Sequence, residues 1–308
     1  MKKKLYIILP TILVTSLFLS GCHVNFGVKE RNSTNEWDKV SNWSDNWTED
    51  LGDWANDISS LAKENNSSNN NNSKIYEENL HETADINGIS KIEISILAST
   101  VTINTIDSNT LTLDCVGSSN IVTNTTIEKT SNSIEIEEHG INSFNNGFDF
   151  GNTLFNDKLN RTVTIGIPKE YAEKLSIECG AGNLIINDVN CNSLIVDGGA
   201  GNLTINNAQF KNLNLAQGVG NTDIRLTRKC GDIEIDGGVG NIFVSMDEVG
   251  GNLTYSGGVG DATINIPENS PVKISTESGI GHTSINAKTS GDTYIFDLSV
   301  GVGKLTVN

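Results

Sequence analysis

The side chains best suited to chemistry are carboxylates and an arginine in the last third of the chain. Asp223 and Arg225 are two residues apart, and Asp232, Glu234 and Asp236 follow with the same spacing. Cleavage of a glycosidic bond needs paired carboxylates. A carbohydrate-active β-helix enzyme, either a polysaccharide lyase or a glycosidase, is therefore the catalytic alternative. Solvated strand faces carry the same alternation of charge, and we expect no catalytic residue and no enzyme.

Metal and nucleotide chemistry lack the patterns that they need. The four histidines, at positions 23, 81, 139 and 282, are far apart, and no HExxH motif occurs, so we expect no metal site. The stretch Gly257–Asn265 is similar to the nonapeptide of calcium-binding β-rolls, but that motif needs aspartate where Ala262 stands and a period of nine. The same glycines lack the GxGxxG spacing of a dinucleotide loop. We interpret the stretch as a structural turn and expect no cofactor.

One cysteine lies at the end of an N-terminal apolar segment. Lys2–Lys4 precede an apolar run, Leu5–Leu19, which is shorter than the roughly 20 residues that span a bilayer. The run ends in Leu19-Ser20-Gly21-Cys22, which resembles the lipobox of bacterial lipoproteins. The resemblance implies a signal peptide over residues 1–21 and a lipid on Cys22. We therefore expect an extracytoplasmic protein anchored to the bacterial cell membrane, the alternatives being an ordinary secretory signal or an uncleaved anchor.

The other four cysteines are Cys115, Cys179, Cys191 and Cys230, without the spacing of a zinc site or a dense disulfide framework. Cys191 and Cys230 hold similar places in the repeat described below, two coils apart. That separation is about 9–10 Å at the usual strand spacing, beyond the reach of a disulfide. We interpret them as small buried thiols.

The chain is acidic, with a formal net charge of −17 from 21 Lys and Arg against 38 Asp and Glu. A polyanion is poorly suited to DNA, RNA or a bare anionic lipid surface. We therefore expect no nucleic-acid partner.

The strongest pattern is a repeated Gly-x-Gly. Its first glycines are separated by 19 to 22 residues, and such a period predicts a solenoid. Two degenerate copies, beginning at Gly279 and Gly301, follow five regular ones. Because glycine tolerates the torsions and close backbone approach of a corner, we predict turns at Gly180, Gly182, Gly199, Gly201, Gly218, Gly220, Gly238, Gly240, Gly258 and Gly260.

Each repeat is predicted to form two strands around one apolar core. Leu194 and Val196, and then Leu203 and Ile205, alternate with polar residues, as in a strand with one face inward. Asparagines recur after the second strand and predict a side-chain amide ladder, at Asn187, Asn206, Asn265, Asn286 and Asn308. Residues 85–178 alternate less regularly. We expect an all-β fold, a single-chain parallel β-helix of about 20 residues per coil over residues 85–308.

A family resemblance supports this fold. The strand Val163–Pro168 ends in Ile-Pro, and Leu175-Ser176-Ile177 and the glycine-containing coils follow. These features resemble the bacterial "putative adhesin" family, a domain of unknown function found in surface and membrane-attached proteins. The resemblance covers roughly residues 85–308, implies a parallel β-helix and brings no catalytic residues.

An amphipathic helix is predicted over residues 33–63, after a tether at 22–32. All four tryptophans of the chain lie in it, and apolar residues recur at steps of three and four: Val40, Trp43, Trp47, Leu51, Trp54, Ile58 and Leu61. Trp43, Trp47 and Trp54 need something to contact, either by self-association or docking on the solenoid flank, or at a membrane interface. Residues 64–84 are predicted to be a low-complexity, disordered linker.

The alternation of apolar and polar residues is interrupted by a stretch of Asn, Gly and four phenylalanines: Phe144, Phe148, Phe150 and Phe155. We interpret them as a loop that caps or flanks the solenoid, or as an aromatic contact surface for glycan or protein.

The sequence thus favours a non-catalytic, lipid-anchored surface protein that displays a β-solenoid for adhesion, envelope scaffolding or partner sensing. An envelope protein or a glycan is the expected partner, besides the membrane. The final strand, Lys304–Asn308, has no residues after it, so we predict that it forms an open edge for self-association or a partner strand.

Overall fold

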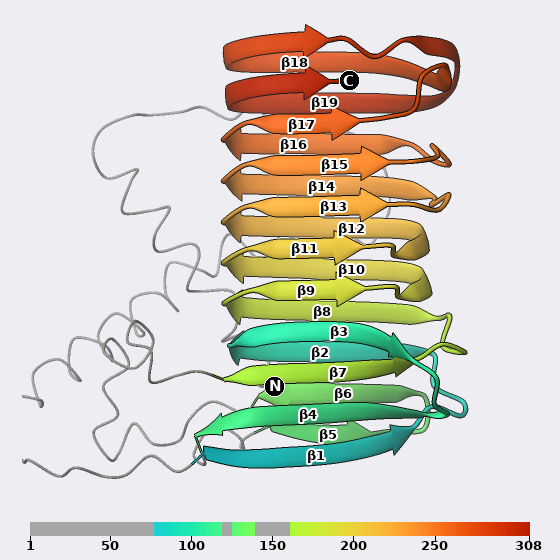
Figure 1. The fold of residues 1–308 in the computed structure, drawn as a ribbon, viewed down its shortest axis with the longest axis vertical. Coiled ribbons are helices and arrows are strands. Elements are labelled where there is room, and N and C mark those ends of the chain that lie inside the picture. The colour runs from blue at the N-terminus through green and yellow to red at the C-terminus, as the bar shows by residue number, and fades with distance from the viewer. Residues whose placement is uncertain (1–76, 119–124, 139–160) are drawn as a thin grey trace, which may run out of the picture.

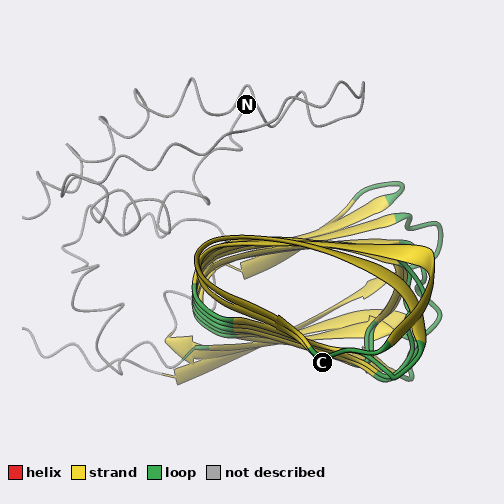
Figure 2. Ribbon diagram, turned by 90° about the horizontal axis from the view of Figure 1, so that it is seen from above, coloured by secondary structure: helices red, strands yellow, loops and turns green. Residues whose placement is uncertain are grey.

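The computed structural model describes residues 77–118, 125–138 and 161–308, and these residues form strands and turns without any helix. The strands stack as successive coils of a solenoid (Figure 1). Seen along the stack, each coil is a flattened loop with one sheet on each long side (Figure 2). The expected all-β solenoid is confirmed.

The first sheet holds one long side of every coil. Its strands pair in this spatial order: β5 (Thr125–Lys129), β6 (Ser133–Glu138), β2 (Lys91–Ala98), β8 (Lys174–Ala181), β10 (Asn190–Ala200), β12 (Gln209–Val219), β14 (Asp232–Val239), β16 (Leu253–Val259), and the first halves of β19 (Thr289–Val307) and β18 (Ser270–Ile285). All these pairings are parallel except that of β5 with β6.

The second sheet closes the other side. Its order is β1 (Glu77–Asp85), β4 (Thr110–Ser118), β7 (Thr162–Pro168), β3 (Thr100–Ile106), β9 (Leu184–Asn187), β11 (Leu203–Asn206), β13 (Thr222–Leu226), β15 (Ile242–Met246), β17 (Ala262–Asn265), and the second halves of β19 and β18. Here β4 is antiparallel to both of its neighbours.

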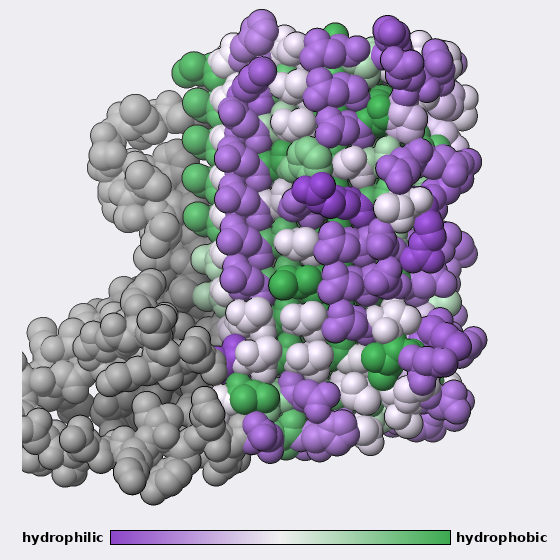
Figure 3. All heavy atoms as spheres, in the orientation of Figure 1, coloured by the Kyte–Doolittle hydropathy of each residue, from purple (hydrophilic) through white to green (hydrophobic). Residues whose placement is uncertain are grey.

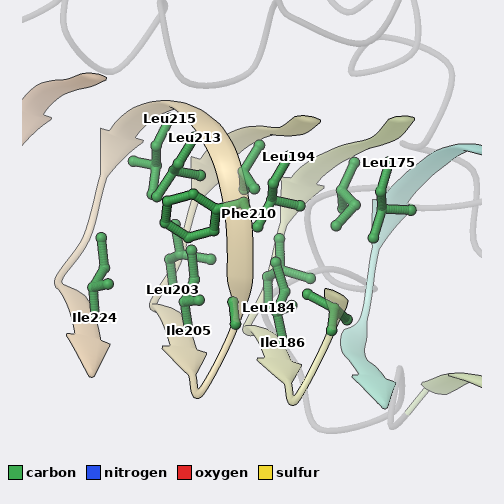
Figure 4. Packing of buried hydrophobic residues seen from close by; sticks show 14 of the residues in the cluster. Leu175, Leu184, Ile186, Leu194, Leu203, Ile205, Phe210, Leu213, Leu215 and Ile224 are labelled. Atoms are coloured by element: carbon green, nitrogen blue, oxygen red, sulfur yellow. The ribbon is translucent and has the colours of Figure 1, made fainter. Parts of the chain in front are cut away.

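The core lies between the two sheets and follows the predicted alternation. Leu194 and Val196 point inward from β10, and Leu203 and Ile205 point back at them from β11; each is at most 1% exposed. Successive coils stack like residues on one another, for example Leu194 on Leu213. Figure 4 shows these rows, with Phe210 filling the space between them. Such burial of apolar area is the main stabilising term of the fold.

From β8 onward, one corner of each coil is the Gly-x-Gly unit, where the chain passes from the first sheet to the second. The second glycine has a positive φ in each copy, for example 122° at Gly182, 139° at Gly220 and 145° at Gly260. At Gly220 a Cβ atom would lie 1.7 Å from the carbonyl oxygen of Gly201 in the coil below. The corner therefore needs glycine both for its torsion and for close backbone contact.

In some of these coils, the opposite corner is formed by left-handed Asp and Asn residues in place of the Gly-x-Gly unit. Asp188 and Asn207 adopt left-handed φ values of 57° and 54° there, a conformation that short polar side chains tolerate. The next residue, Val189 or Ala208, turns inward and is at most 1% exposed. Each of these turns therefore extends the core to the edge of its coil.

The coils at the C-terminal end do not stack in sequence order. The last strand, β19, lies between β16 and β17 on one side and β18 on the other. The prediction that Lys304–Asn308 forms the open edge is therefore wrong: Leu305 pairs with both Ala262 and Thr283. The free edge at this end belongs to β18.

Side-chain chemistry explains this inversion. The inward positions of β19 include Phe296, Leu298 and Leu305, all fully buried. Thr276 and Thr283 are their counterparts on β18, opposite Leu298 and Leu305. Placing the more apolar coil inside buries Phe296, Leu298 and Leu305 and leaves the hydroxyl-bearing positions at the end of the stack, where terminal repeats of solenoids are more polar.

The N-terminal end is also rearranged. The coil made of β2 and β3 lies between β6 and β7 on one side and β8 and β9 on the other. Beyond β7, β4 and β1 add antiparallel strands. Because β1 begins at Glu77, the predicted linker boundary at residue 84 is wrong. The polar sequence of β1 becomes a strand through its pairing with β4, which local pattern does not reveal.

A buried ion pair closes this end of the core. Arg161 contacts Glu138, and both side chains are at most 3% exposed; the guanidinium also donates to the Thr125 hydroxyl. Glu138 and Arg161 flank residues 139–160, which lie outside the described residues together with the predicted Phe surface. The two ends of that segment therefore meet at one place, at the base of the stack.

Candidate interaction surfaces

Two ladders of amide side chains run along the second sheet. In the corner ladder, Asn183, Asn202, Asn221 and Asn241 each accept a hydrogen bond through Oδ1 from the backbone N–H of the next coil, at 2.9–3.3 Å. Asp261 continues the row by accepting from Lys304 at 2.8 Å. Each side chain therefore ties one coil to the next and satisfies a backbone donor at the corner.

The second row, the turn ladder, lies at the end of the strands and was predicted from the sequence. Asn206 donates through Nδ2 to Asn187, and Asn187 donates to Asn104, at 3.0 and 2.9 Å. After an interruption by Arg225 and Ser245 in the same register, Asn286, Asn308 and Asn265 continue it at 2.9 and 3.0 Å. The predicted ladder is confirmed, in two segments.

Between the ladders, the outward face of the second sheet carries one compact polar and aromatic group. Arg225 donates to Asp223 at 2.8 Å, and its guanidinium lies 4.8 Å from the centroid of the Phe243 ring. Thr204 and Thr263 continue this row on either side, in register with Asp223 and Phe243. A ring beside a paired carboxylate and guanidinium can contact both the apolar and the hydroxyl parts of a sugar or a peptide.

The outward face of the first sheet is acidic. Glu178 and Asp197 lie side by side on neighbouring strands, and Glu234 and Asp236 follow on β14. Burial, and secondarily the charge of Asp197, raise the pKa of Glu178 to about 7. Burial also raises the pKa of Asp197 and Asp236. The acidity of the chain thus includes a group of partly desolvated carboxylates, whose charged forms are disfavoured mainly by burial.

The structure separates the carboxylates that the enzyme hypothesis joined. Asp223 and Arg225 are on β13 of the second sheet, whereas Asp232, Glu234 and Asp236 are on β14 of the first sheet. The two groups face outward on opposite sides of the solenoid. Within residues 77–118, 125–138 and 161–308, no group of three or more His, Cys, Asp or Glu could hold a metal ion.

The cysteines of the body are all free and buried: Cys115, Cys179, Cys191 and Cys230. Cys191 pairs with Phe210 of the next coil, and this coil lies between Cys191 and Cys230. The two thiols are therefore two coils apart, as predicted. Burial raises the pKa of Cys179 and of Cys191 to about 12. These thiols are therefore packing groups, since the reactive form of a cysteine is the thiolate.

The middle residues of the Gly-x-Gly units form an apolar row on the outside of the corner, which we call the valine ridge. Its members are stacked in register from coil to coil: Ala181, Ala200, Val219, Val239, Val259, Val302 and Ile280. Figure 3 shows apolar groups, one per coil, along the left margin of the stack beside the polar corner ladder. The glycines of this motif were predicted to form turns, and the apolar residue that recurs between them is the sequence signal that indicates the ridge.

The other predicted site residues lie outside the described residues. These are Cys22, the tryptophans Trp43, Trp47 and Trp54, and the phenylalanines Phe144, Phe148, Phe150 and Phe155. In the part of the chain that the structure describes, no helix is long and apolar enough to cross a membrane.

The fold defines the chain as a single-chain β-solenoid with Gly-x-Gly corners. The chain belongs to the Toastrack family, DUF4097, whose sequence profile matches residues 89–295. No protein with a curated description matches it.

Solved structures with similarity to the chain include three bacterial proteins. A putative adhesin from Bacteroides fragilis is 17% identical, covering 77% of this chain and 98% of its own, with a TM-score of 0.43. A putative cell adhesion protein from Clostridium sporogenes is 16% identical (75% and 99% covered, TM-score 0.34). A putative adhesin from Parabacteroides merdae is 12% identical (75% and 96% covered, TM-score 0.36).

Proposed function

We propose that this chain is a non-catalytic, lipid-anchored protein of the bacterial cell surface that displays its solenoid for adhesion, envelope scaffolding or partner sensing. The observation that carries the proposal is the construction of the outer faces. The second sheet carries amide ladders whose members recur from coil to coil, and the first sheet carries carboxylates on several of its strands. Such faces offer an extended, regular contact surface on a rigid support.

The arrangement of ionisable groups favours this function over catalysis. The carboxylates nearest to a glycosidase-like set are divided between two opposite faces, and Asp223 is already paired with Arg225. An extended partner that follows the stack, such as an envelope glycan or a surface protein, suits rows of amides and hydroxyls better than a small ligand does. Self-association through the end of the solenoid is a separate proposal and would use the free edge of β18.

Anchoring rests on the lipobox sequence before Cys22. Cys22→Ala is expected to move the protein from the membrane fraction to the soluble fraction, because the lipid is the strong anchor in this proposal. Persistence of the variant in membranes after salt and carbonate washes would reject the lipid anchor.

Display and catalysis are separated by one assay on the mature chain. Envelope polysaccharides are incubated with the protein, and both bound material and released oligosaccharides are measured. The proposal expects binding to cells or envelope fractions without release of product. Product release that Asp236→Asn or Asp223→Asn abolishes would overturn it in favour of the carbohydrate-active alternative.

A further inference from the structure

The valine ridge is an apolar surface that the described part of the chain leaves open. Val259, Val302 and Ile280 are exposed by 50%, 42% and 76%, although they stack directly on one another. Stacking within the row covers only the sides of these residues. The other four members, Ala181, Ala200, Val219 and Val239, are half-buried. A contiguous apolar row with an exposed end marks an interaction site.

The shape of the ridge fits an elongated apolar partner. Seven coils contribute to it, so its length is about 29 Å at the usual strand spacing. Rows of glycines, such as Gly218 and Gly220, stand on both sides of Val219 and carry no side chains. The valines therefore stand above their surroundings, and flat aromatic rings can lie against the exposed backbone beside them.

The chain enters the folded domain on the ridge side of the solenoid. Glu77 pairs with Ser118, and Val116 of the same strand pairs with Thr162. Thr162 in turn pairs with Thr100, which directly follows the corner of its coil. The start of β1 therefore lies at the base of the same corner that carries the ridge, as Figure 1 also shows at the left end of β1.

We propose that the amphipathic segment of residues 33–63 docks along the valine ridge of its own chain. Its apolar positions, from Val40 to Leu61, extend over about 32 Å in a helix, close to the length of the ridge. Thirteen residues, 64–76, connect it to β1, and they span up to about 45 Å. The first coil of the ridge is four strands from β1 in the second sheet, about 19 Å away.

Charge favours this occupant over a second copy of the solenoid. Asp197 and Asp236 run beside the ridge on the first sheet, three residues before Ala200 and Val239. Two solenoids paired ridge to ridge would bring these carboxylate rows together, which is unfavourable. In a helix, Asp38, Asp45 and Glu49 of segment 33–63 are opposite its apolar face and would point into solvent on docking. Asp50, Asp53 and Asp57 lie along one flank of that face.

Docking would place the solenoid with its long side toward the anchored segment. Eleven residues, 22–32, separate the lipid-bearing Cys22 from the segment. The segment, rather than the low-complexity linker, would then set the distance and orientation of the solenoid relative to the membrane. The outer face of the second sheet, with Asp223, Arg225 and Phe243, would stay open to partners.

The tryptophans provide a direct test, because Trp37, Trp43, Trp47 and Trp54 are the only tryptophans of the chain and all lie in the segment. The probe is the mature chain with Cys22→Ala, read by tryptophan emission and by acrylamide quenching. The ridge variant is Val239→Asn combined with Val259→Asn. The matched control is Thr263→Asn, an outward position on β17.

We expect blue-shifted, protected emission in the parent and the control, independent of protein concentration. The ridge variant should shift its emission toward that of the unfolded chain and become easier to quench, while the β-sheet signal of the solenoid in far-UV circular dichroism is retained. Equal emission and quenching in all three proteins would overturn the proposal. Protection that appears only as protein concentration rises would also overturn it and would assign the ridge to a second copy.

Discussion

The glycine corners allow a backbone argument to be tested with a single methyl group. Gly220 and Gly88 both have positive φ, at 139° and 76°, but their surroundings differ. A Cβ at Gly220 would lie 1.7 Å from the carbonyl oxygen of Gly201, whereas a Cβ at Gly88 would be 3.9 Å from its nearest neighbour, the carbonyl oxygen of Ser131. Gly88→Ala is therefore the matched control for Gly220→Ala.

The expected magnitudes follow from these distances. Forcing an alanine into a left-handed conformation lowers the free energy of unfolding by about 1–2 kcal/mol, and we expect this for Gly88→Ala. Gly220→Ala adds a backbone clash that only a shift between stacked coils can relieve. Overpacking of that kind costs a further ~1–3 kcal/mol. The corner variant should therefore lose about 2–5 kcal/mol in total.

Urea unfolding followed by far-UV circular dichroism measures both variants against the parent. We expect the midpoint to fall for each variant, further for Gly220→Ala, with the denaturant slope unchanged. In thermal melts each kcal/mol corresponds to about 2–4 °C for a domain of this size. Equal losses for the two variants would refute close backbone contact and leave only the torsional requirement.

Three further predictions concern buried groups. Because the pKa of Glu178 is raised to about 7, its contribution to the free energy of unfolding is full below about pH 4.5 and is lost as pH rises through 7. Glu178→Gln should therefore flatten the dependence of stability on pH over that window, by about 1–2 kcal/mol after solvent screening. An unchanged pH profile of the urea midpoint would contradict this. Arg161→Met removes the buried cation beside Glu138 and should destabilise by about 3–5 kcal/mol, whereas a parent-like melting curve would argue against the ion pair. Cys191, with its pKa raised to about 12, should resist iodoacetamide at pH 8 until urea unfolds the chain; rapid labelling of the native protein would show an accessible thiolate.

Local pattern alone determined the repeating part of the fold. The alternation of Leu194 and Val196 around a Gly-x-Gly corner specifies which side chains point inward, because a strand has a period of two. The recurrence of asparagine at one place per coil likewise specified the turn ladder. These features depend on neighbours within about 20 residues and recur along the stack, although Arg225 and Ser245 interrupt the turn ladder.

Tertiary structure alone decided how the coils are ordered and which faces their charged residues share. Parallel coils offer one another the same backbone hydrogen bonds, so the hydrogen-bonding pattern does not distinguish β18 from β19 as the neighbour of β17. The choice depends on whether Leu298 and Leu305 or Thr276 and Thr283 are buried. That comparison involves residues distant in sequence.

The carboxylate cluster suggested by the sequence is divided between two faces of the solenoid for the same reason. Asp223 and Asp232 are nine residues apart, and their spacing along the chain suggested one cluster. The turn between β13 and β14 carries the chain from the second sheet to the first, so the apolar core separates their outer faces. Sequence spacing determined which residues alternate, whereas the path of each coil around the core decided which of them meet.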